Sequence, residues 1–148
     1  DVFDNAIPCG GSSAANLLLR LATHTGDMSY RTAAENTLRS VREYMEKSGS
    51  GFGGWLSALD YYLSSPKEIV VIGDSKDAAT KALLREVHNR YIPNRVITGA
   101  DSPVTPAPTP LLEARVLVNN APTAYVCENY ACQLPVTDPP ALATQLNA

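Results

Sequence analysis

Cysteine is the residue type with the widest range of chemistry in this chain, which has three. Cys127 and Cys132 enclose four residues, whereas a thioredoxin-type site encloses two and places its reactive thiol at a helix N-terminus. A structural zinc site needs four ligands, and the chain adds only Cys9, His24 and His88. We therefore expect no metal site. Packed free thiols are the favoured interpretation, a local disulfide the second and metal binding the last.

The two histidines do not predict a catalytic set. His24 is expected in a turn at a helix end, and His88 near the end of another helix, where the helix dipole favours a cation. Two histidines in one sequence do not specify a Ser-His-Asp arrangement, because such a triad is recognised by its geometry. Whether the chain is an enzyme is left open by these residues, and we expect no cofactor.

The stretch IVVIGDSKD is similar to the strand-to-helix turn of a nucleotide-binding unit. It lacks both G-x-G-x-x-G and the Gly-Lys-Ser/Thr of a P-loop, so the usual glycines do not arrange backbone amides around a phosphate. Gly73 allows a sharp exit from the strand, and Asp74, Ser75 or Asp77 can cap the next helix. We interpret the stretch as a structural turn.

Composition excludes several classes of partner. The 148 residues carry 12 Lys and Arg against 15 Asp and Glu, a formal charge of −3, and no basic stripe, so we expect no nucleic-acid partner. No apolar run approaches the ~20 residues of a membrane span, and no signal-peptide pattern is present. The expectation is therefore a cytoplasmic protein without a membrane partner.

The elements that position these residues change type once. Apolar residues at helical spacing predict three helices within residues 1–66. The first helix follows IPCGGS, with Ser12 or Ser13 as its N-cap, and has an apolar face of Leu17, Leu18, Leu21 and Ala22. The second has its apolar face at Tyr30, Ala34, Leu38, Val41 and Met45, and the third at Trp55, Leu59, Tyr62 and Leu63.

Residues 67–148 predict a small α/β subdomain. EIVVI and RVIT are expected as parallel strands joined by a helix over 77–91, a βαβ unit. SPVTPAPTP is an extended connector, since proline neither donates to a ladder nor continues a helix. ARVLVN and TAYVC are predicted strands, ENYA a turn, and DPPALATQL a final helix with Asp138 as N-cap and Pro139 first. The fold class is therefore α+β.

Three segments in order resemble the C-terminal part of the YyaL family of thioredoxin-domain-containing proteins: DNAIPCGGSSAANLLLRLATHTGD, GFGGWLSALDYYLSSPKEIVVIGD and TAYVCENYACQLPVTDPPAL. The resemblance implies an upstream thioredoxin-like domain, followed by a ring of paired helices similar to the (α/α)6 toroids of sugar epimerases and glycoside hydrolases. The chain is then expected to be a piece of a longer protein, and its helices part of such a ring.

In helical toroids, the loops that lead into inner helices face the central cavity. The resemblance therefore implies ligand-binding residues near the start of the chain, where a helix N-terminus favours an anionic or hydroxyl-rich ligand. The candidates are Asp4, Asn5, Gly10, Gly11, Ser12 and Ser13, together with Asp60. The alternative is simple N-capping of the helix, or a solvated helix face for Asp60.

Two classes of function follow. The favoured hypothesis is a fragment without catalytic activity of its own. The alternative is part of a carbohydrate-active or sugar-binding toroid, with a carbohydrate-like small molecule as ligand. Three helices have too many large apolar residues to bury among themselves, which predicts a two-fold homodimer through these helices. If the α/β half covers them instead, the chain is a monomer.

Overall fold

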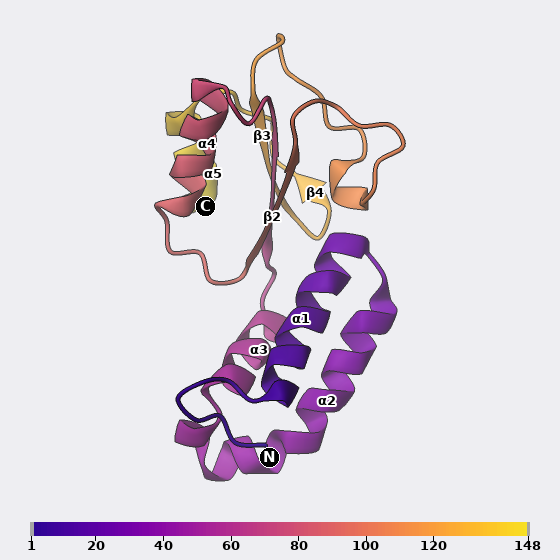
Figure 1. Ribbon diagram of the computed structural model, residues 1–148, viewed down its shortest axis with the longest axis vertical. Coiled ribbons are helices and arrows are strands. Elements are labelled where there is room, and N and C mark those ends of the chain that lie inside the picture. The colour runs from indigo at the N-terminus through magenta and orange to yellow at the C-terminus, as the bar shows by residue number, and fades with distance from the viewer. Residues whose placement is uncertain (1, 148) are drawn as a thin grey trace. The chain divides into compact units, whose positions relative to one another are not determined.

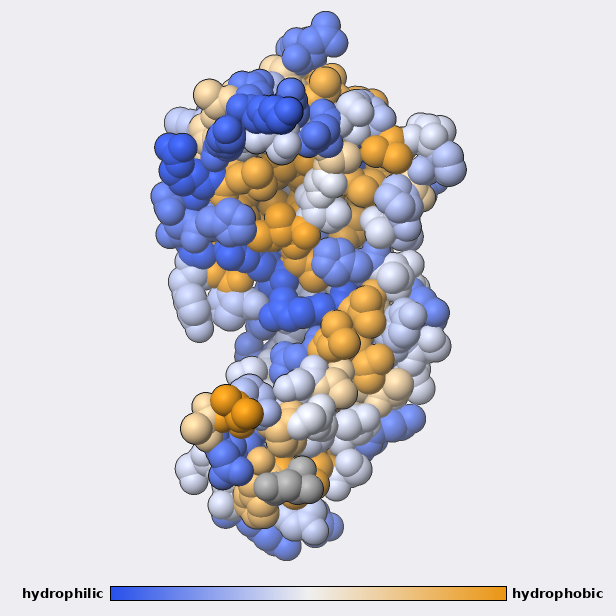
Figure 2. All heavy atoms as spheres, in the orientation of Figure 1, coloured by the Kyte–Doolittle hydropathy of each residue, from blue (hydrophilic) through white to orange (hydrophobic). Residues whose placement is uncertain are grey.

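The computed structural model describes residues 2–147 and divides into two compact units, Asp1–Ser65 and Pro66–Ala148 (Figure 1). We call the first the helical unit and the second the α/β unit. The α+β fold class expected from the sequence is confirmed, because helices come first and a small mixed sheet with its own helices follows. Hydrophobic and hydrophilic residues lie side by side over the face drawn in Figure 2.

The helical unit consists of α1 (Gly10–Thr25), α2 (Met28–Lys47), the short 3-10 helix η1 (Gly49–Gly51) and α3 (Gly53–Leu63). Both α2 and α3 pack mainly on α1 and contact each other much less. The three predicted helices are confirmed, and four of the five apolar positions predicted for α2 are buried. The core of the unit includes Ala15, Leu19, Ala34, Leu38, Val41, Phe52, Trp55, Ala58 and Tyr61.

The predicted apolar faces of α1 and α3 are partly wrong. On α1, Leu19 is buried whereas Leu17 is exposed. On α3, Trp55, Ala58 and Tyr61 are the buried residues, and Leu63 is exposed. The sequence shows which residues are apolar, but α3 is apolar almost all round, so only the position of α1 decides which side is buried.

The cap of α1 also differs from the prediction. Cys9, not Ser12 or Ser13, is the N-cap, and its Sγ accepts a hydrogen bond from the Ser12 amide at 3.4 Å. Ser12 instead lies in the first turn with its side chain fully buried. At the other end, Gly26 has a left-handed backbone (φ 72°) and its N–H donates to the Ala22 carbonyl, which ends α1 before Asp27 caps α2.

The α/β unit contains a four-stranded sheet in the order β2-β1-β3-β4. Its elements are β1 (Lys67–Ile72), α4 (Ala78–His88), β2 (Arg95–Ala100), the 3-10 helix η2 (Pro110–Leu112), β3 (Thr123–Glu128), β4 (Ala131–Cys132) and α5 (Pro139–Asn147). β1 and β2 are parallel neighbours, with Lys67 opposite Arg95, as predicted. β3 pairs antiparallel with the other side of β1. The final helix with an Asp138 cap is also confirmed, since its carboxylate accepts from the Ala141 amide at 3.0 Å.

Helices α4 and α5 pack on each other and bury one face of the sheet. The core on that face consists of Ile69, Val71, Leu83, Val87, Ala124, Val126, Leu142 and Leu146. On the sheet itself, alternate residues of β1, among them Glu68 and Val70, are also buried, as are Leu111 and Leu112 of η2. β1 is therefore covered on both faces, which explains its nearly continuous apolar run.

The strand predicted over residues 114–119 is wrong. Two consecutive asparagines, Asn119 and Asn120, have left-handed backbones and form a turn closed by a single bridge between Val118 and Ala121. Upstream of the turn, the backbone N–H and carbonyl of Val116 both bond to the Tyr125 hydroxyl, at 3.1 and 2.8 Å. A side chain thus satisfies backbone groups that a neighbouring strand would otherwise occupy.

The favoured expectation of free thiols at Cys127 and Cys132 is wrong, because the two residues form a disulfide. They are direct partners in the antiparallel pair of β3 and β4, with their Cα atoms 3.9 Å apart. The turn between them places Asn129 and Tyr130 in left-handed conformations, which reverses the chain within two residues. The hairpin register therefore brings the sulfurs together. No helix within residues 2–147 is long and apolar enough to cross a membrane.

Candidate functional site

The N-terminal candidate residues meet at a junction between the starts of α1 and α3. Asp4 is at its centre. Its Oδ1 accepts hydrogen bonds from the Cys9 amide at 2.8 Å and the Ser12 hydroxyl at 2.6 Å. Its Oδ2 accepts from the Gly54 amide at 2.7 Å and the Trp55 amide at 3.3 Å. One carboxylate therefore binds the first turns of both helices, where the helix dipoles favour a negative charge.

The electrostatics of Asp4 follow from these bonds. Burial by itself would raise the pKa of the carboxyl, but the hydrogen bonds from Ser12, Cys9, Gly54 and Trp55 outweigh it and lower the pKa below its ordinary value. The group therefore stays ionised, and both its oxygens already accept from protein donors. Such a carboxylate is suited to holding two helices together rather than to exchanging protons with a ligand.

Two glycines allow the close approach at this junction. A Cβ on Gly11 would lie 2.7 Å from two ring carbons of Trp55, and a Cβ on Gly54 would lie 2.8 Å from the Ser12 hydroxyl oxygen. The Trp55 indole N–H donates to the Val2 carbonyl at 2.9 Å, which fixes the ring in this position. Gly11 is thus needed for packing.

The remaining candidates are not gathered at the junction. Asn5 and Ser13 are exposed, and Gly10 has open space where a Cβ would be. Asp60 is exposed and lies six residues beyond Gly54, about 9 Å along the helix axis. The structure thus brings together Asp4, Gly11 and Ser12 but not Asp60. Ligand binding at these residues stays a prediction.

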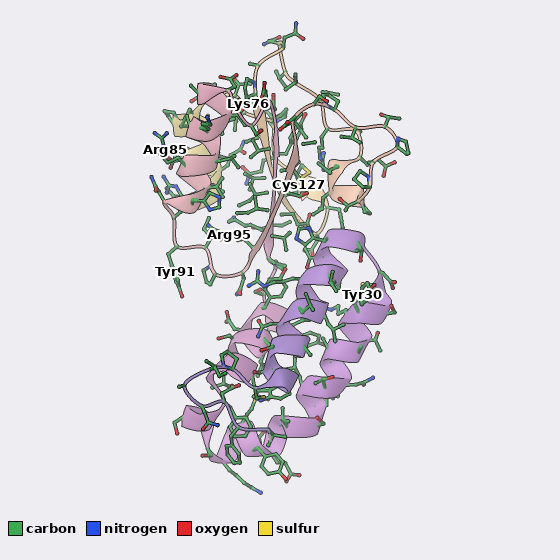
Figure 3. The ribbon with its side chains drawn as sticks, in the orientation of Figure 1. Tyr30, Lys76, Arg85, Tyr91, Arg95 and Cys127 are labelled. Carbon is green, nitrogen blue, oxygen red and sulfur yellow. A yellow bond between two sulfur atoms is a disulfide. The ribbon has the colours of Figure 1, made fainter. Side chains whose placement is uncertain are left out.

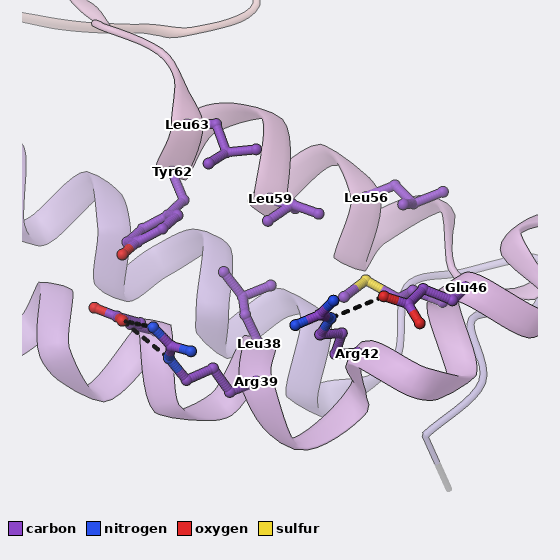
Figure 4. A pocket seen from close by; sticks show the side chains of 10 residues that line it. Leu38, Arg39, Arg42, Glu46, Leu56, Leu59, Tyr62 and Leu63 are labelled. Atoms are coloured by element: carbon purple, nitrogen blue, oxygen red, sulfur yellow. Dashed lines mark hydrogen bonds and ion pairs between the residues drawn. The ribbon is translucent and has the colours of Figure 1, made fainter.

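A groove between α2 and α3 was not predicted as a site (Figure 4). It has a volume of about 550 Å³ and exists because both helices pack on α1 rather than on each other. Its lining residues are Glu35, Leu38, Arg39, Arg42, Met45, Glu46, Leu56, Leu59, Tyr62 and Leu63. The signal in the sequence was the apolar residues of α3 that lie outside its buried face, Leu56, Leu59 and Leu63.

Charged residues of α2 border this groove. Arg39 pairs with Glu35 at 2.6 Å, and Arg42 with Glu46 at 2.8 Å, both at i, i+4 spacing. The hydrogen bond between Glu35 and the Tyr62 hydroxyl raises the pKa of Tyr62, and the Arg31 guanidinium lies 4.4 Å from the centre of the Tyr62 ring. The groove therefore has an apolar floor and a rim with charges of both signs.

At the turn after β1, one of the three residues predicted as a helix cap has that role. Asp77 caps α4 by accepting from the Ala79 amide at 3.0 Å. Gly73 has φ +157°, and a Cβ there would lie 2.6 Å from the Thr80 hydroxyl oxygen. The Ser75 amide donates to the Asp101 carboxylate at 3.1 Å. With Asp74 accepting from the Lys76 amide at 2.8 Å, three carboxylates thus occupy the amides at this turn, where a phosphate would need them free.

The histidines stand apart from these sites. His24 lies in the last turn of α1, where burial and then the charge of Arg20 lower its pKa. His88 is the exposed last residue of α4. Within residues 2–147, no group of three or more His, Cys, Asp or Glu side chains is arranged to hold a metal ion.

Comparison with known proteins identifies relatives over almost the whole chain. Human spermatogenesis-associated protein 20 is 36% identical over 142 residues, which cover 94% of this chain and 18% of the human protein. The mouse protein of the same name is 34% identical over 142 residues, with the same coverage. The chain thus spans about a fifth of the length of these relatives.

No family model matches the chain, and no solved structure matches it. The assignment therefore depends on the sequence relatives, which agree with the resemblance found in the three quoted segments. The chain belongs to the spermatogenesis-associated protein 20 family and corresponds to one segment of its longer members.

Proposed function

We propose that the chain is a non-catalytic interaction module and that the α2–α3 groove is its binding surface. The observation that carries the proposal is the groove itself, whose apolar floor includes leucines that remain accessible. Leu63 is 73% exposed and Leu56 is 40% exposed, although both line the same groove. Apolar side chains gathered in a concave surface are typical of a helix-binding groove.

The occupant we propose is an amphipathic helix. A helix has a diameter of about 10 Å and presents an apolar stripe, and the charged pairs on α2 border the groove with both signs. In a protein as long as the relatives, a neighbouring helix of the same chain fills this position, as in a ring of paired helices. In the chain of 148 residues, a second copy supplies it and forms a two-fold dimer.

The free energy available from burying the groove leucines predicts weak association between two copies. Fully burying a leucine side chain contributes about 1.5–3 kcal/mol, and the groove has three that remain partly or largely exposed. Two copies in a symmetric interface double this gain, but association costs at least ~4 kcal/mol and often much more. Because Leu63 is 73% and Leu56 only 40% exposed, just part of this gain is available, and the balance gives a dissociation constant of roughly 0.1 mM or weaker.

Light scattering across a dilution series from roughly 1 mM to 10 µM covers this affinity. We expect the mass to fall from dimer to monomer. The double variant Leu56→Glu and Leu63→Glu is expected to be monomeric throughout, because both residues are exposed and can change without loss of the fold. Leu17→Glu is the matched control, since Leu17 is 58% exposed on α1 and does not line the groove. A monomer mass at every concentration, without binding of an exposed-hydrophobe dye, would refute the proposal.

The carbohydrate-binding alternative concerns a different place, the junction around Asp4. No observation favours it over the structural role, since protein donors occupy both oxygens of Asp4. Upstream thioredoxin-like and toroid regions, and a cytoplasmic location, stay predictions for the whole protein. Amide shifts of Asn5 and Ser13 on addition of monosaccharides test the alternative directly.

A further inference from the structure

The two sulfurs of the Cys127–Cys132 disulfide have different surroundings. Cys127 is 1% exposed within β3, whereas Cys132 is exposed on β4, the outermost strand of the sheet. Figure 3 shows Cys127 on the other side of the strands from Arg85 of α4. Cys132 is therefore the residue of the pair that an external reagent meets first from solvent.

Arg115 holds a positive charge against both sulfurs. Its Nη2 lies 3.0 Å from the Cys132 Sγ and 3.8 Å from the Cys127 Sγ. Its Nε donates to the Leu111 carbonyl at 3.0 Å, and its guanidinium lies 4.9 Å from the centre of the Tyr125 ring. The cation is therefore fixed before any reaction, and a fixed cation stabilises negative charge that develops on sulfur.

Glu68 supplies an acidic group on the same face. It lies directly opposite Cys127 in the β1–β3 register and is only 3% exposed. Its Oε2 accepts from the amide of Tyr130, in the turn between the two cysteines, at 3.0 Å. Side chains of directly opposed residues lie on the same face with Cβ atoms about 5 Å apart. A carboxyl group is thus beside the buried sulfur.

Burial raises the pKa of Glu68, more than the Tyr130 amide and the Arg115 charge lower it. The other charged group that acts on it is Glu128 of β3, which pairs with Lys67 of β1 at 2.9 Å. Glu68 therefore keeps its proton to a higher pH than an ordinary glutamate. A disulfide that only stabilises a hairpin needs neither a fixed cation nor a buried acid beside it.

We infer that Cys127, Cys132, Arg115 and Glu68 form a redox site that exchanges its disulfide with an external dithiol. A thiolate of the dithiol attacks the Cys132 Sγ and forms a mixed disulfide. The Cys127–Cys132 bond breaks, and Cys127 leaves with the electron pair and takes a proton from the Glu68 carboxyl. Arg115 stabilises the negative charge shared by the sulfurs during this step.

The second thiol of the dithiol then attacks its own sulfur in the mixed disulfide. The dithiol closes to a cyclic disulfide, and Cys132 leaves as a thiolate beside Arg115. Two electrons pass from the dithiol to the protein. The dithiol releases two protons to solvent, and Glu68 takes one proton back from solvent. The net reaction therefore releases one proton.

The test uses the full chain with Cys9→Ser, so that only the pair contributes thiols. Dithiothreitol is the probe, and acid quenching, alkylation and mass measurement give the rate of reduction under native conditions. We expect a rate that rises in proportion to dithiothreitol concentration, because the folded chain is attacked directly. A rate that becomes independent of dithiothreitol concentration would mean that unfolding is required and would overturn the inference.

Variants identify the contribution of the cation. Removing a charge beside a thiolate raises its pKa by at least about one unit, and a Brønsted sensitivity near one half converts this into a rate about threefold slower for Arg115→Gln. Arg115→Lys keeps the charge and should recover part of the rate. Arg85→Gln is the matched control, because it removes the same charge from the exposed surface of α4. Equal rates for Arg115→Gln and Arg85→Gln would contradict the role of Arg115.

A pH profile identifies the acid. The rate constant is divided by the ionised fraction of dithiothreitol, so that only groups of the protein remain. In the parental chain we expect this corrected value to fall as Glu68 loses its proton with rising pH. Glu68→Gln should be slower at low pH and should lack the fall, although its side-chain oxygen can still accept from Tyr130. An unchanged profile in Glu68→Gln would remove Glu68 from the mechanism.

Discussion

Replacing Asp4 should destabilise the helical unit far more than removal of an ordinary helix cap. Phe52, at the N-cap position of α3, makes no side-chain cap bond, so Asp4 caps α3 from 50 residues away. Loss of that cap costs about 1 kcal/mol. Loss of the charged bonds to the Cys9 amide and the buried Ser12 hydroxyl costs roughly 2 kcal/mol more, since the hydroxyl keeps a second contact with the Cys9 carbonyl. Asp4→Ala should therefore cost about 3 kcal/mol.

Native-state hydrogen exchange measures this effect separately for each unit. A loss of about 3 kcal/mol lowers the protection of slowly exchanging amides in α1 and α3 by about 100-fold. Amides of β1 and β3 belong to the α/β unit and serve as an internal reference. Asp27→Ala is the matched control, because Asp27 caps α2 through one exposed bond to Ser29 and should cost only about 1 kcal/mol.

The effect should also depend on pH in a defined direction. Because the folded-state pKa of Asp4 is lowered, its contribution is fully present above the ordinary carboxyl pKa of about 3.9 and is lost as pH falls through the lowered value. The difference between the parental chain and Asp4→Ala should thus shrink on acidification. The reasoning fails if Asp4→Ala costs no more than Asp27→Ala, or if the difference stays constant from pH 6 to well below the ordinary carboxyl pKa.

Three further outcomes are expected. Gly11→Ala should destabilise the helical unit, because its Cβ would meet the Trp55 ring at 2.7 Å. Gly10→Ala is the control and should be neutral or stabilising, because a Cβ there meets nothing within 4 Å. Equal urea midpoints for the two variants would contradict this prediction. Glu68→Gln should raise stability at pH 7 more than at pH 4, because the raised folded-state pKa makes the parental chain lose stability as pH rises, and parallel urea melts at the two pH values test the sign. Reduction of the disulfide, which closes a loop of about six residues, should cost about 2 kcal/mol, measured as a lower urea midpoint for the reduced chain; coincident curves would show that the bond adds no stability.

Local patterns were enough to predict most elements. The three helices, the parallel β1–β2 pair, the Asp77 and Asp138 caps and the ENYA turn each depend on residues close in sequence. The prediction of a strand over 114–119 failed because the hydroxyl of Tyr125, nine residues further along the chain, takes the backbone groups of Val116. The disulfide was only the second interpretation, because a cytoplasmic protein keeps most of its thiols reduced, but the hairpin register places the two cysteines directly opposite each other.

The candidate sites likewise combine features that depend on residues close in sequence with features that depend on distant ones. The resemblance to helical toroids singled out Asp4 and Ser12 as ligand-binding candidates, whereas their joint structural role also needs Gly54 and Trp55, about 50 residues further along the chain. The groove could not be predicted, because it depends on how far α2 and α3 stand apart on α1. Arg115 and Glu68 were missed because no local motif links them to the cysteines.

The attachment of residues 2–4 to α3 has a consequence for the order of events during synthesis. Val2 and Asp4 leave the ribosome about 50 residues before their partners Gly54 and Trp55. Closing a loop of that length costs about 3 kcal/mol in conformational entropy, and this cost arises before any contact offsets it. The α1–α2 hairpin has no such requirement, because its helices are joined by two residues. The α1–α2 hairpin should therefore form first during synthesis, and residues 2–4 should become attached only when α3 emerges.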